Sequence, residues 1–286
     1  MTYPKKNPDI SLKIRLSFAV LLLPIFCLSE TYAAPSPDLW PRWQDHQPES
    51  AMVLDHTPWD YLLEEYLVTD HPSGINRFRY GAVSPEDRKK LSEYLGYLQE
   101  IRVSSLNRQK QLAYWINLYN ALTVKVILDH YPVESIRDIN ISPGFFSSGP
   151  WDAKLLNIDG EKLSLNDIEH RILRPIFKDN RIHYAVNCAS LGCPELQPVA
   201  FTAANTEELL EKGARTYINS PRGARMEKRR LHVSSIYKWF QVDFGGSEAG
   251  VIKHLRLYAE GDLAEDLQSY DRGLRYEYDW SLNEPE

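Results

Sequence analysis

The chain has 286 residues, of which 43% are hydrophobic and 25% are charged, and its formal net charge at pH 7 is −6. This length suffices for one large domain or two small ones. The negative charge argues against general nucleic-acid binding, which requires a basic surface that displaces counterions. One basic stretch is an exception, and we interpret it as a solvated loop or as an anion- or membrane-surface contact: Arg222, Arg225, Lys228, Arg229 and Arg230.

Residues 1–33 have the pattern of a secretory signal peptide. Basic side chains between positions 5 and 15 precede the mostly apolar run 16–28, and Thr31-Tyr32-Ala33 supplies small residues for cleavage. Thirteen residues are few for a bilayer span. Removing this segment takes away four basic and two acidic side chains, which leaves a formal charge of −8. We therefore expect a periplasmic or secreted protein that begins near Ala34 and has no transmembrane span.

Residues 34–56 are rich in proline and polar side chains, which predicts an extended lead-in. A hydroxyl residue followed by proline and an acid predicts helix starts at Thr57 and Ser84. Apolar residues at helical spacing predict that the longest helix spans 109–130. The expected helices with defined bounds are 57–68, 84–101, 109–130, 206–219 and 247–259. A short helix is expected to begin within 164–167 and to end at Pro175, and a single helical turn is expected after Ser234 or Ser235.

The expected strands are short. Asp159-Gly160 predicts the turn of a hairpin within 154–163, and alternating apolar and charged residues predict a closing strand over 274–280. Two further strands are expected at 181–187 and 231–233. Long helices with scattered short strands predict an α+β fold, a single domain over 57–286 with several helices packed on a small, mostly antiparallel sheet. Because helices separate the strands, an α/β fold is the alternative.

The segment 181–194, RIHYAVNCASLGCP, contains both cysteines of the expected mature chain. In an exported protein, Cys188 and Cys193 around a turn of small residues predict a structural disulfide. The alternative is that Cys188 is a thiolate nucleophile, which would need a nearby base or positive charge. Redox shuttling is less favoured, because the usual redox motif separates its cysteines by two residues.

A histidine would be the natural base for such a thiol. On a strand, His183 would point to the face opposite Cys188 and would reach it only if the chain bends at Asn187. His170 or His232 would have to fold close instead. His170 follows Glu169, but neighbours in a helix do not face each other, so we also consider it a packed or capping histidine.

Two asparagines share one face of the long apolar helix, Asn117 and Asn120. Buried amides need hydrogen-bond partners, so these residues either tie down neighbouring backbone or line a polar pocket. The sequence contains no zinc, calcium, phosphate-binding or serine-hydrolase motif, and we expect no metal or cofactor. The candidate binding residues are Asn120, Trp115, Asn187, Trp239 and Asp243.

Four segments in order carry a family resemblance: 113–122 (AYWINLYNAL), 164–170 (SLNDIEH), 183–194 (HYAVNCASLGCP) and 237–244 (YKWFQVDF). Together they resemble the domain-of-unknown-function 547 family over roughly residues 87–258. The segment 278–283, YDWSLN, is similar to the tail of bacterial members. The family has no agreed reaction, so the resemblance implies a family and not an activity.

We therefore expect an exported protein of this family that serves as an envelope binding or accessory protein, with no partner indicated by the sequence. The alternative is a thiol-dependent hydrolase or transferase acting on an amide or peptide-like substrate. In that case Cys188 would be the nucleophile, His183 or His170 the base, and Asn117 an orienting or oxyanion-binding amide. Its pocket would lie between the 109–130 helix and the segment 183–193. The sequence alone does not decide between enzyme and binding protein.

Overall fold

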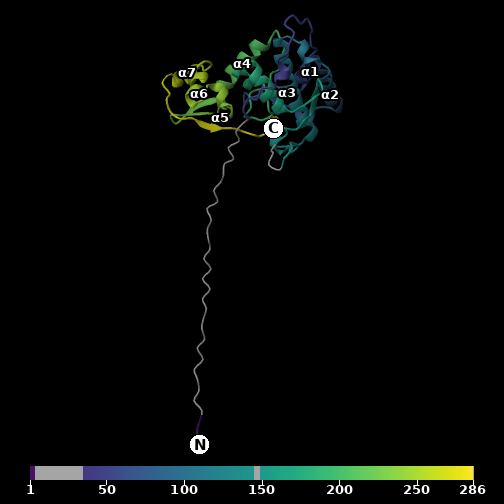
Figure 1. Cartoon of the computed structure of the whole chain (residues 1–286). Coiled ribbons are helices and arrows are strands. Elements are labelled where there is room, and N and C mark those ends of the chain that lie inside the picture. The colour runs from purple at the N-terminus through teal and green to yellow at the C-terminus, as the bar shows by residue number, and fades with distance from the viewer. Residues whose placement is uncertain (4–34, 145–148, 286) are drawn as a thin grey trace. The chain divides into compact units, whose positions relative to one another are not determined.

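The computed structural model describes residues 1–3, 35–144 and 149–285 of the chain (Figure 1). By its internal contacts the chain divides into two units, Met1–Tyr32 and Ala33–Glu286, and the second contains every element described below. The predicted signal peptide falls almost wholly within residues 4–34, outside the described residues. In the described part of the chain, no helix has both the length and the apolar character that crossing a bilayer requires.

Helices dominate the second unit. The α-helices are α1 (Thr57–Tyr66), α2 (Pro85–Gln99), α3 (Arg108–His130), α4 (Thr206–Ile218), α5 (Ile236–Trp239), α6 (Glu248–Leu255) and α7 (Gly261–Gln268). The π-helix η5 spans Asp167–Phe177. The 3-10 helices are η1 (Pro41–Gln44), η2 (Tyr80–Ala82), η3 (Val103–Ser105), η4 (Ile136–Asp138), η6 (Asn180–Tyr184) and η7 (Gln241–Phe244).

The strands form three small sheets. The two hairpins pair β1 (Leu67–Val68) with β2 (Arg77–Phe78), and β3 (Leu156–Ile158) with β4 (Glu161–Leu163). The third sheet has the order β5 (Ala224–Glu227), β6 (Arg230–Ser234), β7 (Arg275–Glu277), with β5 antiparallel and β7 parallel to β6. The predicted α+β class, with mostly antiparallel sheets, is confirmed.

The helix starts follow the local signals. Ser84 accepts a hydrogen bond from the N–H of Asp87 at 3.1 Å, and Asn107 accepts one from Lys110 at 2.9 Å. These caps satisfy N–H groups that have no partner inside the first turn. At α1 the expectation was wrong in detail, because Thr57 is already helical and its N–H donates to Asp55 at 2.9 Å.

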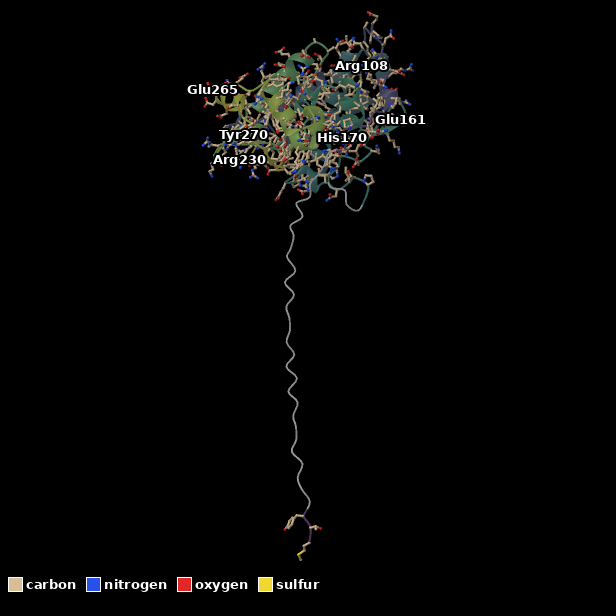
Figure 2. The ribbon with its side chains drawn as sticks, turned by 60° about the vertical axis from the view of Figure 1, so that its left-hand side comes forward. Arg108, Glu161, His170, Arg230, Glu265 and Tyr270 are labelled. Atoms are coloured by element: carbon tan, nitrogen blue, oxygen red, sulfur yellow. The ribbon has the colours of Figure 1, made fainter. Side chains whose placement is uncertain are left out.

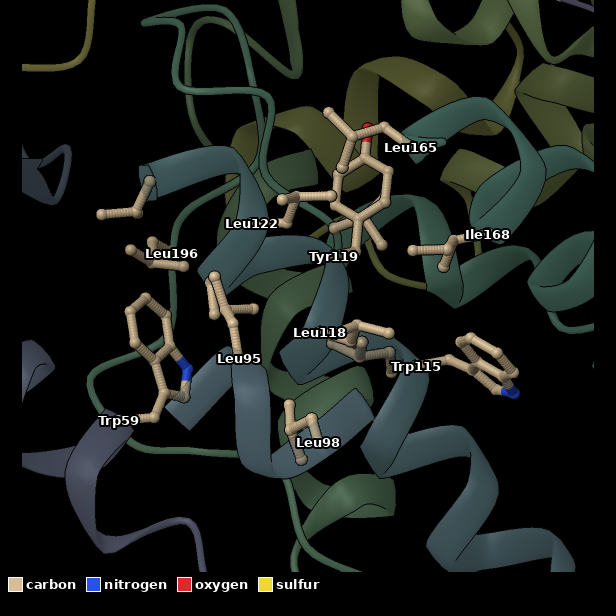
Figure 3. Close-up of a cluster of buried hydrophobic side chains, with 14 of the residues drawn as sticks. Trp59, Leu95, Leu98, Trp115, Leu118, Tyr119, Leu122, Leu165, Ile168 and Leu196 are labelled. Carbon is tan, nitrogen blue, oxygen red and sulfur yellow. The ribbon is translucent and has the colours of Figure 1, made fainter. Parts of the chain in front are cut away.

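The larger core surrounds α3, in which every residue from 113 to 124 is buried. Figure 3 shows side chains of α3 meeting those of α2 and of the start of η5 in this core. A second cluster of buried side chains comes from helices α4, α5, α6 and α7 and from the three-stranded sheet. Within it, the hydroxyl of Tyr270 accepts a hydrogen bond from the N–H of Leu231, and Figure 2 labels Tyr270 and the neighbouring Arg230. Tyr184 packs in the second cluster and Ala185 in the first, so the chain crosses between the cores here.

Two local predictions were wrong. The run 181–187 is not a strand, because Asp179 accepts the N–H of Arg181 at 2.9 Å and starts the 3-10 helix η6. Pro175 does not end its helix either. It lies inside the π-helix η5, which ends at Phe177 and is followed by Lys178 with φ +55°.

The C-terminal third also differs from the expectation. The helix predicted over 247–259 ends at Leu255, and α7, which the sequence did not indicate, begins at Gly261. The closing strand is shorter than predicted, spanning only Arg275–Glu277. Because it pairs parallel to β6, its register is set by a distant strand and not by a local turn.

Candidate functional site

Residues 187–194, which we call the cysteine loop, follow directly after the crossing between the two cores. Asn120 of α3 holds its entrance: the side-chain amide donates to the carbonyl of Ala185 at 2.9 Å and accepts the N–H of Asn187 at 2.8 Å. Asn187 in turn accepts the N–H of Ala189 at 2.8 Å and donates to the carbonyl of Pro194 at 2.7 Å. Two buried asparagines therefore fix the backbone on both sides of Cys188.

Ala189 stores strain immediately after Cys188. Its φ of +59° lies in the left-handed region, which a residue with a Cβ rarely adopts. Its N–H is held by Asn187, and its carbonyl accepts the N–H of Asn283 at 3.0 Å. Such strain persists only where surrounding contacts enforce it, and it concentrates at functional sites.

Residues 278–283, which we call the C-terminal segment, run along the cysteine loop. The N–H of Leu191 donates to Ser281 and the N–H of Gly192 donates to Asp279, both at 2.8 Å. A Cβ at Gly192 would lie 2.8 Å from backbone atoms of Asp279, closer than real Cβ contacts. Glycine at this position therefore lets the two segments approach closely.

Both cysteines are free thiols, so the predicted disulfide is not confirmed. The Cys193 sulfur accepts the N–H of Cys188 at 3.0 Å and is thereby held against the backbone. The Cys188 sulfur lies 3.2 Å from Oγ of Ser190 and 3.1 Å from the hydroxyl of Tyr278. Cys193 is buried, whereas Cys188 is partly exposed.

The two thiols differ in acidity. The pKa of Cys188 is lowered, because hydrogen bonding to Cys193, together with that to Ser190 and Tyr278, outweighs the effect of burial. Burial, followed by the hydrogen bond and the charge of Cys188, raises the pKa of Cys193 well above its usual range. A thiolate is the reactive form of cysteine, so the lowered pKa makes Cys188, and not Cys193, the candidate nucleophile of the pair.

His183 lies between two carboxylates. Its Nε2 is 2.7 Å from Oδ2 of Asp243, and its Nδ1 is 3.7 Å from Oε1 of Glu169. The ring stacks on Phe240 with centroids 4.1 Å apart. Arg174 donates to the same oxygen of Asp243 at 2.6 Å, so a buried charge network surrounds the imidazole.

Glu169 is the second carboxylate of that network. Burial alone would raise its pKa, but the charges of His170, His183 and Arg174 hold that pKa at about 2. The carboxylate is therefore ionised, and it accepts a hydrogen bond from Tyr119 at 3.1 Å. Across the described residues, neither His183 nor His170 makes a hydrogen bond with Cys188. The structure thus does not pair the nucleophile with either base candidate.

The remaining candidates divide between the site and the core. Asn117 pairs with both backbone groups of Phe201, at 2.7 and 2.9 Å, and Trp115 is fully buried against Trp43. No hydrogen bond joins either of them to the cysteine loop among the described residues. Trp239 packs against Tyr278 with ring centroids 4.7 Å apart, and Tyr278 in turn contacts the Cys188 sulfur. Asp243 belongs to the His183 network.

Reasoning from the sequence did not place Tyr278 at the site. It is separated from Cys188 by 90 positions in the chain, and the alternation around it indicated a half-buried strand. Arg174 was missed as well, although its position one turn after His170 places both on one helix face.

Replacing Tyr278 with phenylalanine should raise the pKa of Cys188, because the thiolate loses a hydroxyl donor while the ring is kept. We expect alkylation of Cys188 at pH 7 to slow by about two- to tenfold. The measurement is the pH dependence of the alkylation rate. Tyr276→Phe is the matched control, since that hydroxyl donates to Glu248 at 3.1 Å, and an equal effect of both variants would contradict the assignment.

One family model matches the chain. Residues 103–218 match the family described as "Protein of unknown function, DUF547". The matched stretch includes α3, the cysteine loop and α4, so the resemblance inferred from the sequence is confirmed for this part of the chain. Tyr278 and Asp243 lie outside it. No curated protein and no solved structure matches the chain.

Proposed function

We propose, from the premise that residues 103–218 resemble the DUF547 family, that this is an exported accessory protein of the cell envelope whose Cys188 and Cys193 undergo thiol–disulfide exchange. One observation carries the proposal. The Cys188 sulfur meets two hydroxyl groups in a strained, rigidly held turn, beside a second free thiol that is also part of the loop.

The chemistry balances within the pair and its substrate. The Cys188 thiolate attacks one sulfur of a substrate disulfide, which breaks the S–S bond, forms a mixed disulfide and releases one substrate thiolate. Cys193 then loses its proton and attacks the Cys188 sulfur, which releases the second substrate thiolate. The substrate disulfide gains two electrons, and the protein is left with a Cys188–Cys193 disulfide. The reverse sequence would oxidise a substrate dithiol.

The site favours this exchange over acyl transfer to Cys188. A thiol hydrolase needs a base at the sulfur, and the hydrogen-bond partners of Cys188 are hydroxyl and thiol groups. His183 is itself buried between Asp243 and Glu169. Exchange needs no such base, since it depends on the acidity of the attacking thiol and on access to it.

Trapping of the mixed disulfide tests the proposal. The Cys193→Ser variant cannot complete the second step, so incubation with a small disulfide should leave a stable adduct on Cys188, visible in the intact mass. Cys188→Ser should form none. Wild-type protein should instead gain an internal disulfide, and its mass should fall by two hydrogen atoms.

Two results would overturn the proposal. One is a Cys193→Ser protein whose Cys188 stays unmodified by disulfides while alkylating agents label it. The other is a Cys188–Cys193 bridge, in protein from its native compartment, that small dithiols cannot reduce. Either result would favour an envelope binding protein in which these residues serve the structure.

A further inference from the structure

A cavity of about 360 Å³ lies beside the cysteine loop. It is lined by Gly192, Pro221, Arg222, Arg225, Glu277, Tyr278 and Asp279. Two of these belong to the thiol centre, since Gly192 directly precedes Cys193, and the hydroxyl of Tyr278 is 3.1 Å from the Cys188 sulfur. Tyr278 therefore contacts both the cavity and the Cys188 sulfur.

The cavity wall carries both signs of charge. Arg225 and Glu277 form an ion pair at 2.6 Å whose side chains are 35% and 49% exposed, so the pair can open to a competing ligand at little cost. Asp279 accepts the N–H of Ser281 and has no ion-pair partner among the described residues. The wall thus offers a guanidinium for an anion and a carboxylate for a cation.

Arg222 plays a different part in the same wall. It donates to the carbonyls of Leu191 and Cys193, at 3.0 and 2.7 Å, and pairs with Glu195 at 3.0 Å. These contacts commit its guanidinium to the cysteine loop. Arg222 thus holds the loop beside the cavity. Arg225 donates to the carbonyl of Pro221 at 3.2 Å and pairs with Glu277, but its side chain is more exposed than that of Arg222, so it is the guanidinium that a ligand can reach.

We propose that this cavity binds the α-amino-acid end of a small disulfide, of the cystine or glutathione disulfide class. Asp279 would hold the ammonium group and Arg225 the carboxylate, and the disulfide would reach Cys188 at the edge of the Tyr278 ring. The cavity volume is at the lower end of ligand pockets, which suits one arm of such a molecule. The inference rests on the proposed function, and it specifies a substrate class.

The experiment compares three disulfides as oxidants of the reduced full-length protein: glutathione disulfide, cystine and the neutral bis(2-hydroxyethyl) disulfide. The rate at low oxidant concentration should fall by about tenfold for the two amino-acid disulfides in Arg225→Gln and in Asp279→Asn. The rate with the neutral disulfide should not change, which shows that the variants are folded and that Cys188 is still reactive.

Arg230→Gln is the matched control, because this basic residue belongs to the same stretch of sequence but does not line the cavity. It should leave all three rates unchanged. Equal rates for the wild type and both cavity variants would overturn the substrate class while leaving the proposed function intact. Failure of all three disulfides to oxidise the wild-type protein would overturn both proposals.

Discussion

Replacing Arg174 with alanine should lower the free energy of unfolding by about 3–5 kcal/mol, as expected when one partner of a buried ion pair is removed. The Arg174 side chain is 2% exposed and binds Asp243 at 2.6 Å. It also donates to the carbonyl of Pro35 at 2.6 Å and lies 3.0 Å from Nδ1 of His170. Without Arg174, the carboxylate of Asp243 would lose its arginine partner and, among the described residues, would keep only its contact with His183.

Chemical denaturation of the two proteins at pH 7 measures this loss. Arg215→Ala is the control, because that arginine pairs with Glu211 and Glu260 on the surface, where ion pairs contribute about 0–1 kcal/mol. Arg174→Lys should fall between the wild type and the alanine variant, since it keeps the charge but not the fork of donors. If Arg174→Ala costs no more than Arg215→Ala, the network does not stabilise the fold as we infer.

Acidification from pH 6.5 to 4 should destabilise the protein by about 3 kcal/mol through His254 alone. This histidine is buried, and its Nε2 is 2.7 Å from the hydroxyl of Tyr184. Burial, with the charge of His183 adding to it, lowers the pKa of His254 from 6.5 to about 4. The unfolded chain binds the proton first, so the stabilisation is complete above pH 6.5 and is lost as the pH falls toward 4.

The measurement is the free energy of unfolding at a series of pH values, for the wild type and for His254→Gln. The variant should be less stable at pH 7 and should show a flatter pH dependence between pH 6.5 and 4. His46→Gln is the control, since His46 is exposed and should leave the slope unchanged. An identical slope for the wild type and His254→Gln would show that another group is responsible.

Elements with local signals could be predicted from the sequence. Ser84, Asn107 and Ser247 each accept an N–H of the first turn, and these capping interactions connect residues three positions apart. The hairpin at Asp159-Gly160 is equally local, because both residues adopt the positive φ that its turn requires. Such features need no knowledge of the rest of the fold.

The errors arose where distant contacts decide the structure. The residues 181–187 are apolar enough for a strand, but none of the strands in the described part of the chain pairs with them. Instead, the 3-10 helix η6 ends at Tyr184, and the chain passes from one core to the other at Tyr184 and Ala185. The parallel pairing of β7 with β6 likewise depends on helices α6 and α7 that lie between them in the chain.

The site shows the same division. The sequence singled out Cys188 and Cys193, because cysteines in a short turn are conspicuous in any chain. It did not distinguish Asn120, which holds the cysteine loop, from Asn117, which holds Phe201, because the two share one helix face. Only the three-dimensional arrangement shows which backbone each amide meets.

The thiol centre is completed by a segment that is synthesised well after the cysteines, since Tyr278 lies 90 positions beyond Cys188. Until residues 278–283 emerge, the N–H groups of Leu191 and Gly192 lack their carbonyl partners, and Cys188 lacks the Tyr278 hydroxyl. A nascent chain that has folded its helices up to α7 would thus carry two cysteines without their final acidity. The final acidity of Cys188 therefore depends on a segment that reaches the cysteine loop from 90 positions further along the chain.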